Sequence, residues 1–513
     1  MTSGARIEAL ASPSGKRRRR LVFACVVVAL SLYGWFLARH MGAVAGGADS
    51  SGYFNQARAL SELETHVPVR ELPGLSLQQA PTDYLYVPLG FRPTKDKEAL
   101  AMTYPIGLPL LIAASAAVVG WVHAGGVVMW LHAMGALFVV YALGRSLDLS
   151  SPWAAVGAAI VAVSAVYVCM ALQAMSDVPS LTWVTLAVLA AWKSRQASTP
   201  GRGAALAAGA GAAFALAVLI RPTNSLALIP LLLALGFSWR RMLAFGLAGL
   251  PGAALLAWHN HAAYGAVFSS GYGNIAGIMS WAIVPRTLLH YATWLPVLFG
   301  PQVLLVPLLP FVGGRFRRVE AWVLVTWATL FLGFFVAYYH THETWWYLRF
   351  VLPMMPAGVL GGLLVLDAWS RRFGARTRRR FVLAAAVVSI GVPLHWTDRL
   401  NAEESGYGER VYPEMVEWVR ANVPPDGVIV CMQASGALYF STGYTIVRWD
   451  VIPRDRMNEV VVPLDTSGLP VFAVLWAFEY PRALEALGGE WVEEGRVRDV
   501  TIWRRVTPTA EIP

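Results

Sequence analysis

Long apolar blocks, separated by short polar loops, run along the chain from Leu21 to about Leu394. An α-helix needs about 20 apolar residues to cross a bilayer, and most of these blocks approach or reach that length. The pattern therefore predicts an α-helical polytopic membrane protein. The apolar blocks are 21–38, 105–122, 126–144, 152–170, 178–193, 204–220, 223–237, 241–258, 288–312, 320–339, 350–369 and 381–394.

Arginine-rich loops indicate how the blocks thread the membrane, because lysine and arginine accumulate on the cytoplasmic side. If the N-terminus is cytoplasmic and block 105–122 only dips into the outer side of the membrane, one large set of basic residues lies inside. If that block crossed, the whole set would lie outside. We therefore predict about eleven spans. The set comprises Lys193, Arg195, Arg202, Arg240, Arg241, Arg315, Arg317, Arg318, Arg371, Arg372, Arg376, Arg378, Arg379 and Arg380.

This topology divides the chain into three parts. They are a cytoplasmic basic segment 1–20, a transmembrane part 21–394 that includes a long outer loop 39–125, and an outer part 395–513. The outer loops are longer than the inner ones and richer in aromatic and acidic residues, so we expect function on the outer face. A basic run before an apolar block also resembles a signal peptide, but further spans follow, so we expect an uncleaved first helix.

The last part of the chain changes character, because helical and strand patterns alternate there. This alternation predicts a small α/β domain outside the membrane. It contains no glycine-rich phosphate loop, nucleophile elbow or metal-binding spacing, so we expect an accessory role. The expected strands are 427–431, 444–449, 471–477 and 500–505, and the expected helices are 412–424 and 480–489.

The composition agrees with a membrane protein and gives no reason to expect a nucleic-acid partner. Hydrophobic residues make up 56% of the chain and charged residues only 14%, which is unusual for a soluble protein. The net charge of +10 comes from loops that the positive-inside bias already explains. The three cysteines form no CxxC pair, so neither a disulfide framework nor a thiolate metal site is expected.

The segment after the first block, "GGADSSGYFNQARAL", combines helical periodicity with a carboxylate. Tyr53, Phe54, Ala57 and Leu60 recur at helical spacing, which predicts a short amphipathic helix at the membrane interface. Asp49 lies just before it, at an ordinary place for an N-cap. On this pattern alone the N-cap is favoured over a catalytic role.

Further candidates lie where predicted spans reach the outer face. "YPIGLPLL" begins at Tyr104, "MSDVP" contains Asp177, "RPT" begins at Arg221 and "WWYLRFVLPMMP" contains Arg349. Arginine offers a bidentate fork to phosphate oxygens, although arginines at span ends also snorkel to the interface. Asp177 could equally be a loop cap before Pro179.

In their order along the chain, these motifs resemble those of the GT-C glycosyltransferases that use polyprenyl-phosphate sugars. The likeness is greatest to the branch of protein O-mannosyltransferases and aminoarabinose transferases. The resemblance implies a GT-C-like fold, a polyprenyl-phosphate-linked sugar as donor, and a protein, lipid or glycan hydroxyl as acceptor, without a cofactor. The positions that carry it are Asp49, Tyr104-Pro105-Ile106-Gly107, Asp177-Val178-Pro179, Arg221-Pro222-Thr223, and Arg349 with Pro353.

The resemblance also implies roles for these residues. Polyprenyl phosphate is already a good leaving group, so the reaction needs a base rather than a general acid. Asp49 would be this base, and it would be more effective if partial burial raised its pKa. Asp177 would orient the acceptor or the base. Arg221 and Arg349 would neutralise the departing phosphate.

Three positions depart from the family pattern. Asp49 is not followed by a second carboxylate, and Ile106 replaces a proline. Tyr104 stands where the family often has a lysine that contacts phosphate. We expect Tyr104 to contact the substrate, and the candidates for the missing cation are Lys95 and Lys97.

Two histidine clusters are further candidates, "HTHE" with His340, His342 and Glu343, and "HNH" at 259–261. Histidines two apart with an acid nearby are a weak metal signal, and the carboxylate pair of metal-dependent oligosaccharyl relatives is absent. We therefore expect these side chains to line a sugar cavity, without a metal. The aromatic residues 345–347 are typical of an interfacial belt.

These observations together predict an inverting glycosyltransferase of the bacterial inner (plasma) membrane, with the lipid-linked sugar and membrane lipids as partners. The rival from another class is a transporter or flippase for a lipid-linked glycan. No internal repeat is evident, the spans are nearly free of acidic residues, and the first outer loop is long and polar. These features favour chemistry at a surface. An inactive relative that only binds lipid-linked sugar is a third alternative.

Overall fold

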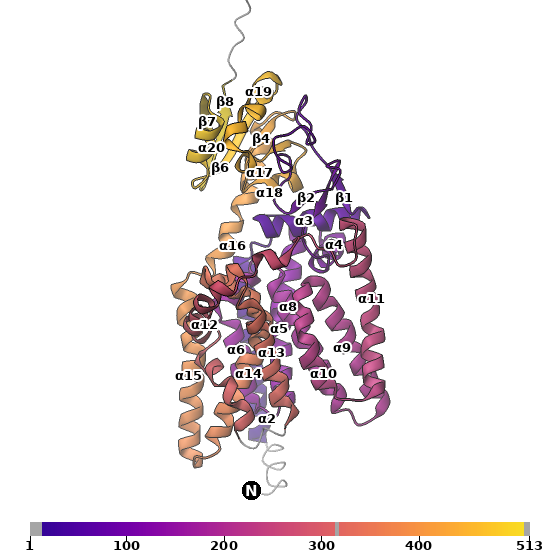
Figure 1. Ribbon diagram of the computed structural model, residues 1–513. Helices are drawn as coiled ribbons and strands as arrows, with labels where there is room; N and C mark the ends of the chain where they lie inside the picture. The colour runs from indigo at the N-terminus through magenta and orange to yellow at the C-terminus, as the bar shows by residue number, and fades with distance from the viewer. Residues whose placement is uncertain (1–12, 313–317, 507–513) are drawn as a thin grey trace, which may run out of the picture.

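The computed structural model describes residues 13–312 and 318–506. A bundle of long helices forms one end of the molecule and an α/β region forms the other, with α3 (Ala48–Ser61) between them (Figure 1). Residues 1–12 and 313–317, which belong to basic segments assigned above to the cytoplasmic side, lie outside the described residues.

Each apolar block of the sequence corresponds to helical structure. Within the described ranges, six helices are long and apolar enough to cross a membrane, or eight if each of two bent helix pairs is one span. Three more apolar helices are shorter. The bundle elements are α2 (Pro13–His40), α4 (Gly107–Val119), α5 (Trp121–Ser146), α6 (Ser151–Ala162), α7 (Ala165–Ala171), α8 (Asp177–Arg195), α9 (Pro200–Ile220), η1 (Pro222–Ala227), α10 (Leu228–Leu235), α11 (Trp239–Tyr264), α12 (Val284–Leu298), η4 (Pro301–Phe311), α13 (Val319–Phe335), η7 (Trp345–Met354), α14 (Met355–Ser370) and α15 (Ala375–Arg399).

Two of the predicted spans are not straight helices. Block 152–170 consists of α6 and α7, bent by 63°, and block 288–312 consists of α12 and η4, which belong to a helix pair bent by 103°. The first break occurs at Ser164, which is extended (φ −74°, ψ 128°). The second pair breaks around Gly300, and η4 contains prolines that cannot donate the hydrogen bonds of a regular helix.

Block 105–122 forms the short helix α4, which ends at Gly120. This glycine has φ +76°, a left-handed conformation from which the chain starts α5 in a new direction. The 13 residues of α4 would extend about 20 Å, less than the ~30 Å hydrocarbon core of a bilayer. The helix is therefore too short to cross a membrane upright.

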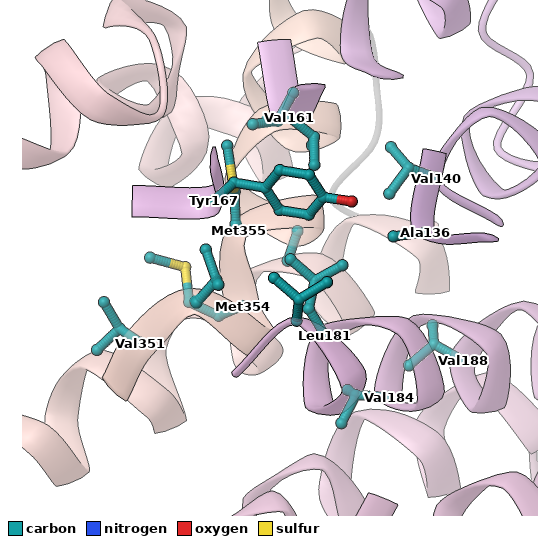
Figure 2. Close-up of a cluster of buried hydrophobic side chains, with 14 of the residues drawn as sticks. Ala136, Val140, Val161, Tyr167, Leu181, Val184, Val188, Val351, Met354 and Met355 are labelled. Atoms are coloured by element: carbon teal, nitrogen blue, oxygen red, sulfur yellow. The ribbon is translucent and has the colours of Figure 1, made fainter. Parts of the chain in front are cut away.

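A continuous apolar core joins the middle of the bundle. Figure 2 shows the Tyr167 ring of α7 pointing toward Ala136 and Val140 of α5, in one cluster with Leu181 of α8, Met354 of η7 and Met355 of α14. All of these side chains are buried, and the Tyr167 hydroxyl donates to the Ala133 carbonyl. This packing fixes the start of α8 and the segment η7, which both carry candidate site residues.

The helix α3 is not the interfacial amphipathic helix that its periodicity predicted. Its polar side chains Asn55 and Gln56 are buried as completely as its apolar ones. The Asn55 amide donates to the Gly436 carbonyl of α18 (Ser435–Ser441) over 3.0 Å. The α/β region thus covers the face that was expected to meet water or lipid headgroups.

The outer loop beyond α3 contains a small antiparallel sheet. Its strand order is β1-β3-β2, so the last strand lies in the middle. This sheet packs near α3 at the junction between the bundle and the α/β region (Figure 1). The strands are β1 (His66–Pro68), β2 (Phe91–Pro93) and β3 (Ala99–Met102).

The α/β region contains a five-stranded sheet with the order β5-β4-β6-β8-β7. The pairs β4–β5 and β4–β6 are parallel, and the pairs β6–β8 and β7–β8 are antiparallel. The four predicted strands and two predicted helices are confirmed, whereas α16, α18, α19 and β7 were not predicted. The elements are α16 (Glu404–Glu409), α17 (Val411–Asn422), β4 (Val428–Val430), β5 (Thr445–Val447), α19 (Asn458–Thr466), β6 (Val471–Trp476), α20 (Tyr480–Leu487), β7 (Trp491–Val497) and β8 (Val500–Arg505).

Candidate active site

Asp49 lies in the first turn of α3 and uses both carboxylate oxygens in long-range contacts. The Tyr104 hydroxyl donates to Oδ1 over 2.7 Å, and the Arg349 guanidinium donates to Oδ2 over 2.9 Å. The N-cap of the helix is Gly47, and no side chain makes a capping bond. The N-cap interpretation of Asp49 was therefore wrong, although a first-turn carboxylate is still favoured by the helix dipole.

Tyr104 reaches Asp49 because α3 has a glycine at the crossing point. A Cβ at Gly52 would lie 2.1 Å from Cε2 of Tyr104, so a larger residue would displace the ring. The ring also packs against Tyr53, with centroids 4.7 Å apart. Tyr104 thus holds the carboxylate, and it lines neither of the two cavities that adjoin Asp49.

Arg349 is held in η7, a 3₁₀ segment that contains Pro353 and leads into α14. Its side chain is only 15% exposed, and its guanidinium lies 5.3 Å from the centroid of the Phe350 ring. Such burial, together with the ion pair to Asp49, excludes the interpretation that Arg349 merely snorkels from a span end to the interface.

Arg221 forms the second ion pair of the site, with Asp177. The guanidinium of Arg221 donates to Asp177 Oδ1 over 2.6 Å, and the carboxylate is 1% exposed. Arg221 is extended because it precedes Pro222, which turns the chain from α9 into η1. Asp177 begins α8 but makes no side-chain cap bond, so the loop-cap interpretation was also wrong.

The electrostatic state of Asp49 differs from the expectation that burial would raise its pKa. Burial is the largest influence and does act upward, but the charge of Arg349 and the hydrogen bond from Tyr104 act in the opposite direction. The more distant charge of Arg221 adds to them, and the pKa of Asp49 is held below its ordinary value. Asp49 is consequently an ionised carboxylate at neutral pH.

Two cavities meet at Asp49. The first, which we call the aromatic cavity, has a volume of about 300 Å³ and contains Asp177, Arg221 and Arg349 at its polar end. The second, the polar cavity, has a volume of about 370 Å³. Asp49, Tyr347 and Arg349 line both. The apolar part of the aromatic cavity is formed by Ile278, Phe334, Phe335 and Phe350.

The polar cavity includes a carboxylate that sequence reasoning missed. Glu409, at the end of α16, lines it together with Gln173 and Trp346. The Gly47 amide donates to Glu409 Oε2 over 3.2 Å, across 362 positions of sequence. No motif surrounds Glu409, so only the tertiary structure identifies it. Trp346 and Tyr347 line cavities and are not simply members of an interfacial aromatic belt.

The remaining candidates are only partly brought to the site. Lys97 pairs with Asp83 over 2.7 Å and Lys95 is exposed, and neither lysine lines either cavity. His340 lines the aromatic cavity, where its Nδ1 lies 3.1 Å from Glu343 Oε2. His342 and Glu343 do not line that cavity.

Comparisons with known proteins identify the fold. No protein-family model matches the chain, and no curated protein matches it. Among solved structures, ArnT from Cupriavidus metallidurans bound to undecaprenyl phosphate is similar, with a TM-score of 0.58 and 13% identity over 94% of this chain and 98% of that one. The chain has the GT-C glycosyltransferase fold.

Two other GT-C structures support the same fold. The Archaeoglobus fulgidus oligosaccharyltransferase, in complex with zinc and sulfate, has a TM-score of 0.52 and 12% identity over 90% of this chain and 71% of that one. The mycobacterial arabinofuranosyltransferase AftD has a TM-score of 0.50 and 12% identity over 94% of this chain, which spans only 41% of AftD. All three similarities extend over most of the present chain, so the GT-C fold accounts for its overall architecture.

One of these GT-C structures holds zinc, which raises the question whether the present site offers a ligand set. Within residues 13–312 and 318–506, no three or more His, Cys, Asp and Glu side chains are grouped to hold a metal ion. His340 and Glu343 pair with each other, and His259 lies against Gln56 over 3.4 Å. Both oxygens of Asp49 are engaged by protein donors. These residues do not fit a metal.

Proposed function

We propose that the protein is an integral membrane glycosyltransferase that moves a sugar from a polyprenyl phosphate to an acceptor hydroxyl. The observation that carries this proposal is the Asp49–Arg349 ion pair at the meeting point of two cavities. A base and a phosphate-binding cation are the two groups that such a transfer requires. The GT-C fold, and undecaprenyl phosphate bound by ArnT, support the donor class.

The donor would occupy the aromatic cavity. Arg221 and Arg349 both reach its polar end, where two guanidinium groups can neutralise a phosphate. The phenylalanine-rich wall suits the first isoprenoid units of the lipid. Asp177 would act as a positioning residue, because its ion pair fixes the guanidinium of Arg221.

The acceptor would enter from the polar cavity, on the other side of Asp49. Asp49 removes the proton from the acceptor hydroxyl, and the oxygen attacks the anomeric carbon of the sugar. The bond from that carbon to the phosphate oxygen breaks with its electron pair, so polyprenyl phosphate leaves and the configuration inverts. Positioning of both reactants supplies much of the acceleration.

The lowered pKa of Asp49 is compatible with this role because Arg349 is shared. The guanidinium that lowers the pKa of the carboxylate also lines the donor cavity. A phosphate bound there would offset the positive charge that Asp49 experiences. Asp49 would then be more basic in the donor-bound enzyme than in the empty enzyme.

We also propose a topology of about eleven spans, with the N-terminus in the cytoplasm and residues 395–513 outside a bacterial inner membrane. Helix α8 runs from Asp177 at the site to Arg195, and α9 returns from Pro200 to end beside Arg221. The basic residues at the end of α8 and the start of α9 therefore lie about 28 Å from the site, at the opposite end of the bundle. This separation agrees with an outer site and basic cytoplasmic loops.

Single cysteines would test this orientation. In a background without the three native cysteines, Glu98→Cys lies on the proposed outer face and Arg376→Cys on the inner one. A membrane-impermeant maleimide should label only Glu98→Cys in cells with a permeabilised outer envelope and an intact inner membrane. Labelling of Arg376→Cys alone would reverse the proposed topology.

The function is tested by the release of free polyprenyl phosphate from a native lipid extract, with acceptor-containing membranes present. Wild type should release it, and Asp49→Asn should reduce the rate by about a thousandfold or more, because it loses the base. The exposed Asp148→Asn is the matched control and should behave as wild type. Equal release by Asp49→Asn would remove Asp49 from the mechanism. No release by wild type, with donor and acceptor verified, would favour transport or binding.

A further inference from the structure

Glu409 is a carboxylate that the α/β region extends into the polar cavity beside Asp49. Its Oε2 accepts a hydrogen bond from the Gly47 amide over 3.2 Å. A Cβ at Gly46 would lie 1.8 Å from the same oxygen, so the absence of a side chain there provides the space that the carboxylate occupies. Glu409 is thus fitted against the backbone that leads into α3 and Asp49.

Docking of the α/β region does not use the whole hydrogen-bonding capacity of Glu409. An ionised carboxylate offers about four lone-pair positions. The Gly47 amide occupies one of them. The side chain is only partly buried and lines the polar cavity, where the remaining positions are available to a ligand.

The other walls of the polar cavity suit a carbohydrate. The rings of Trp346 and Tyr347 provide apolar faces. The amide oxygen of Gln173 provides an acceptor, whereas its nitrogen already donates to the Cys169 carbonyl over 3.2 Å. Asp49 and Glu409 are acceptors for hydroxyl hydrogens. A sugar carries several hydroxyls around an apolar C–H face, whereas a serine or threonine side chain carries one hydroxyl. Two carboxylates in one cavity therefore match a polyol better than a peptide.

We propose that Glu409 binds the acceptor, and that the acceptor is a carbohydrate that presents one hydroxyl to Asp49 and a second to Glu409. This inference rests on the proposed transferase function and specifies its acceptor. Glu409 contacts the substrate but takes no part in the making or breaking of covalent bonds. The proton of the first hydroxyl goes to Asp49, and the second hydroxyl fixes the orientation of the attacking oxygen.

The acceptor class is tested with an envelope glycan fraction that has been freed of donor lipid. Portions are left untreated, digested with protease, or oxidised with periodate, which cleaves vicinal diols. The native lipid extract supplies the donor, and polyprenyl phosphate release is measured. Untreated and protease-digested portions should support release by the wild type, and the periodate-oxidised portion should not. Release that survives periodate but is lost after protease digestion would overturn the carbohydrate assignment.

The role of Glu409 is tested by the dependence of the rate on acceptor concentration. Glu409→Gln should raise the half-saturating acceptor concentration about ten- to hundredfold, as expected for the loss of a hydrogen bond to a charged group. The maximal rate and half-saturating donor concentration should change little. Glu404→Gln, in the same short helix but exposed, is the matched control. Gly46→Ala should reproduce the acceptor defect, because it displaces the intact Glu409 carboxylate.

The outcomes separate this inference from the function on which it rests. Unchanged acceptor saturation in Glu409→Gln, while Asp49→Asn is inactive, would overturn only the role of Glu409. A loss of thermal stability, with equal increases in the half-saturating concentrations of donor and acceptor, would mean that Glu409 only docks the α/β region. That result would also overturn the role of Glu409 in acceptor binding. No release by wild type with any portion would overturn the transferase function itself.

Discussion

Arg349 donates to Asp49 over 2.9 Å across 300 positions of sequence. The ion pair brings η7, at the entry to α14, against the first turn of α3. Because both residues line both cavities, one guanidinium lies between the proposed base and the place where the donor phosphate would bind. In the proposed mechanism, the pair would couple the occupancy of the donor cavity to the basicity of Asp49.

Replacement of Arg349 should affect donor use most strongly. Arg349→Ala leaves Asp49 without its cation and removes a phosphate ligand, so kcat/KM for the donor should fall at least about a hundredfold, as for other desolvated charge pairs. Arg349→Lys should have an intermediate kcat/KM, because lysine keeps the positive charge but lacks the bidentate guanidinium. Initial rates of polyprenyl phosphate release at varied donor concentration measure this effect. The exposed Arg376→Ala should be unaffected, and wild-type donor saturation in Arg349→Ala would contradict the assignment.

Tyr104→Phe should change the pH dependence of the reaction more than its rate at neutral pH. The hydroxyl of Tyr104 stabilises the ionised form of Asp49, so its removal should raise the pKa of that carboxyl. The acid limb of kcat/KM should then move to higher pH, because Asp49 must be ionised to act as a base. Tyr141→Phe, which loses a hydroxyl remote from the site, is the control. An unchanged acid limb would show that Tyr104 does not tune the base.

The features that the sequence predicts well are those encoded by local pattern. Apolar blocks yielded the helices of the bundle, and alternation yielded four strands of the α/β region. Strand β7 was not predicted because its sequence, WVEEGRV, is largely exposed and its pairing with β8 is irregular between Glu493 and Gly495. The 103° bend before η4 was missed because hydropathy does not indicate direction.

The site could be predicted only where a motif marks it. Asp49, Asp177, Arg221 and Arg349 stand in ordered motifs, and the structure places all four around one cavity. Glu409 has no such motif, since its partner at Gly47 depends on how the α/β region packs on α3. The direction of the pKa shift of Asp49 was likewise inaccessible, because it depends on the balance of burial against two long-range partners.

Asp177→Asn should separate stability from donor binding. The change leaves Arg221 without its anionic partner in a largely buried place, so we expect a loss of about 2–4 kcal/mol of stability, together with weaker donor saturation. The double variant Asp177→Asn/Arg221→Met removes both charges and should recover most of the thermal stability but not the activity. Thermal unfolding in detergent and release assays measure the two effects. Recovery of activity in the double variant would exclude Arg221 from phosphate binding.

Acceptor affinity should vary with pH near neutrality. Burial, with a smaller contribution from the charge of Asp49, raises the pKa of Glu409 to about 7, although the hydrogen bond from the Gly47 amide opposes the shift. Glu409 is therefore mainly protonated below this pH and ionised above it. An ionised carboxylate accepts a hydroxyl hydrogen bond more strongly. The half-saturating acceptor concentration should consequently fall as the pH rises through about 7.

Titration of the other groups that adjoin Glu409 would not produce this pH dependence. The pKa of Asp49 is lowered and that of Tyr412 is raised, mainly by burial of the phenol, so both keep one charge state between about pH 6 and 8. Arg349 stays cationic. Cys169 also lines the cavity, and Cys169→Ser tests whether its thiol contributes. Acceptor saturation should become independent of pH in Glu409→Gln but keep its pH dependence in Cys169→Ser. A pH dependence that persists in Glu409→Gln would assign the titration to another group.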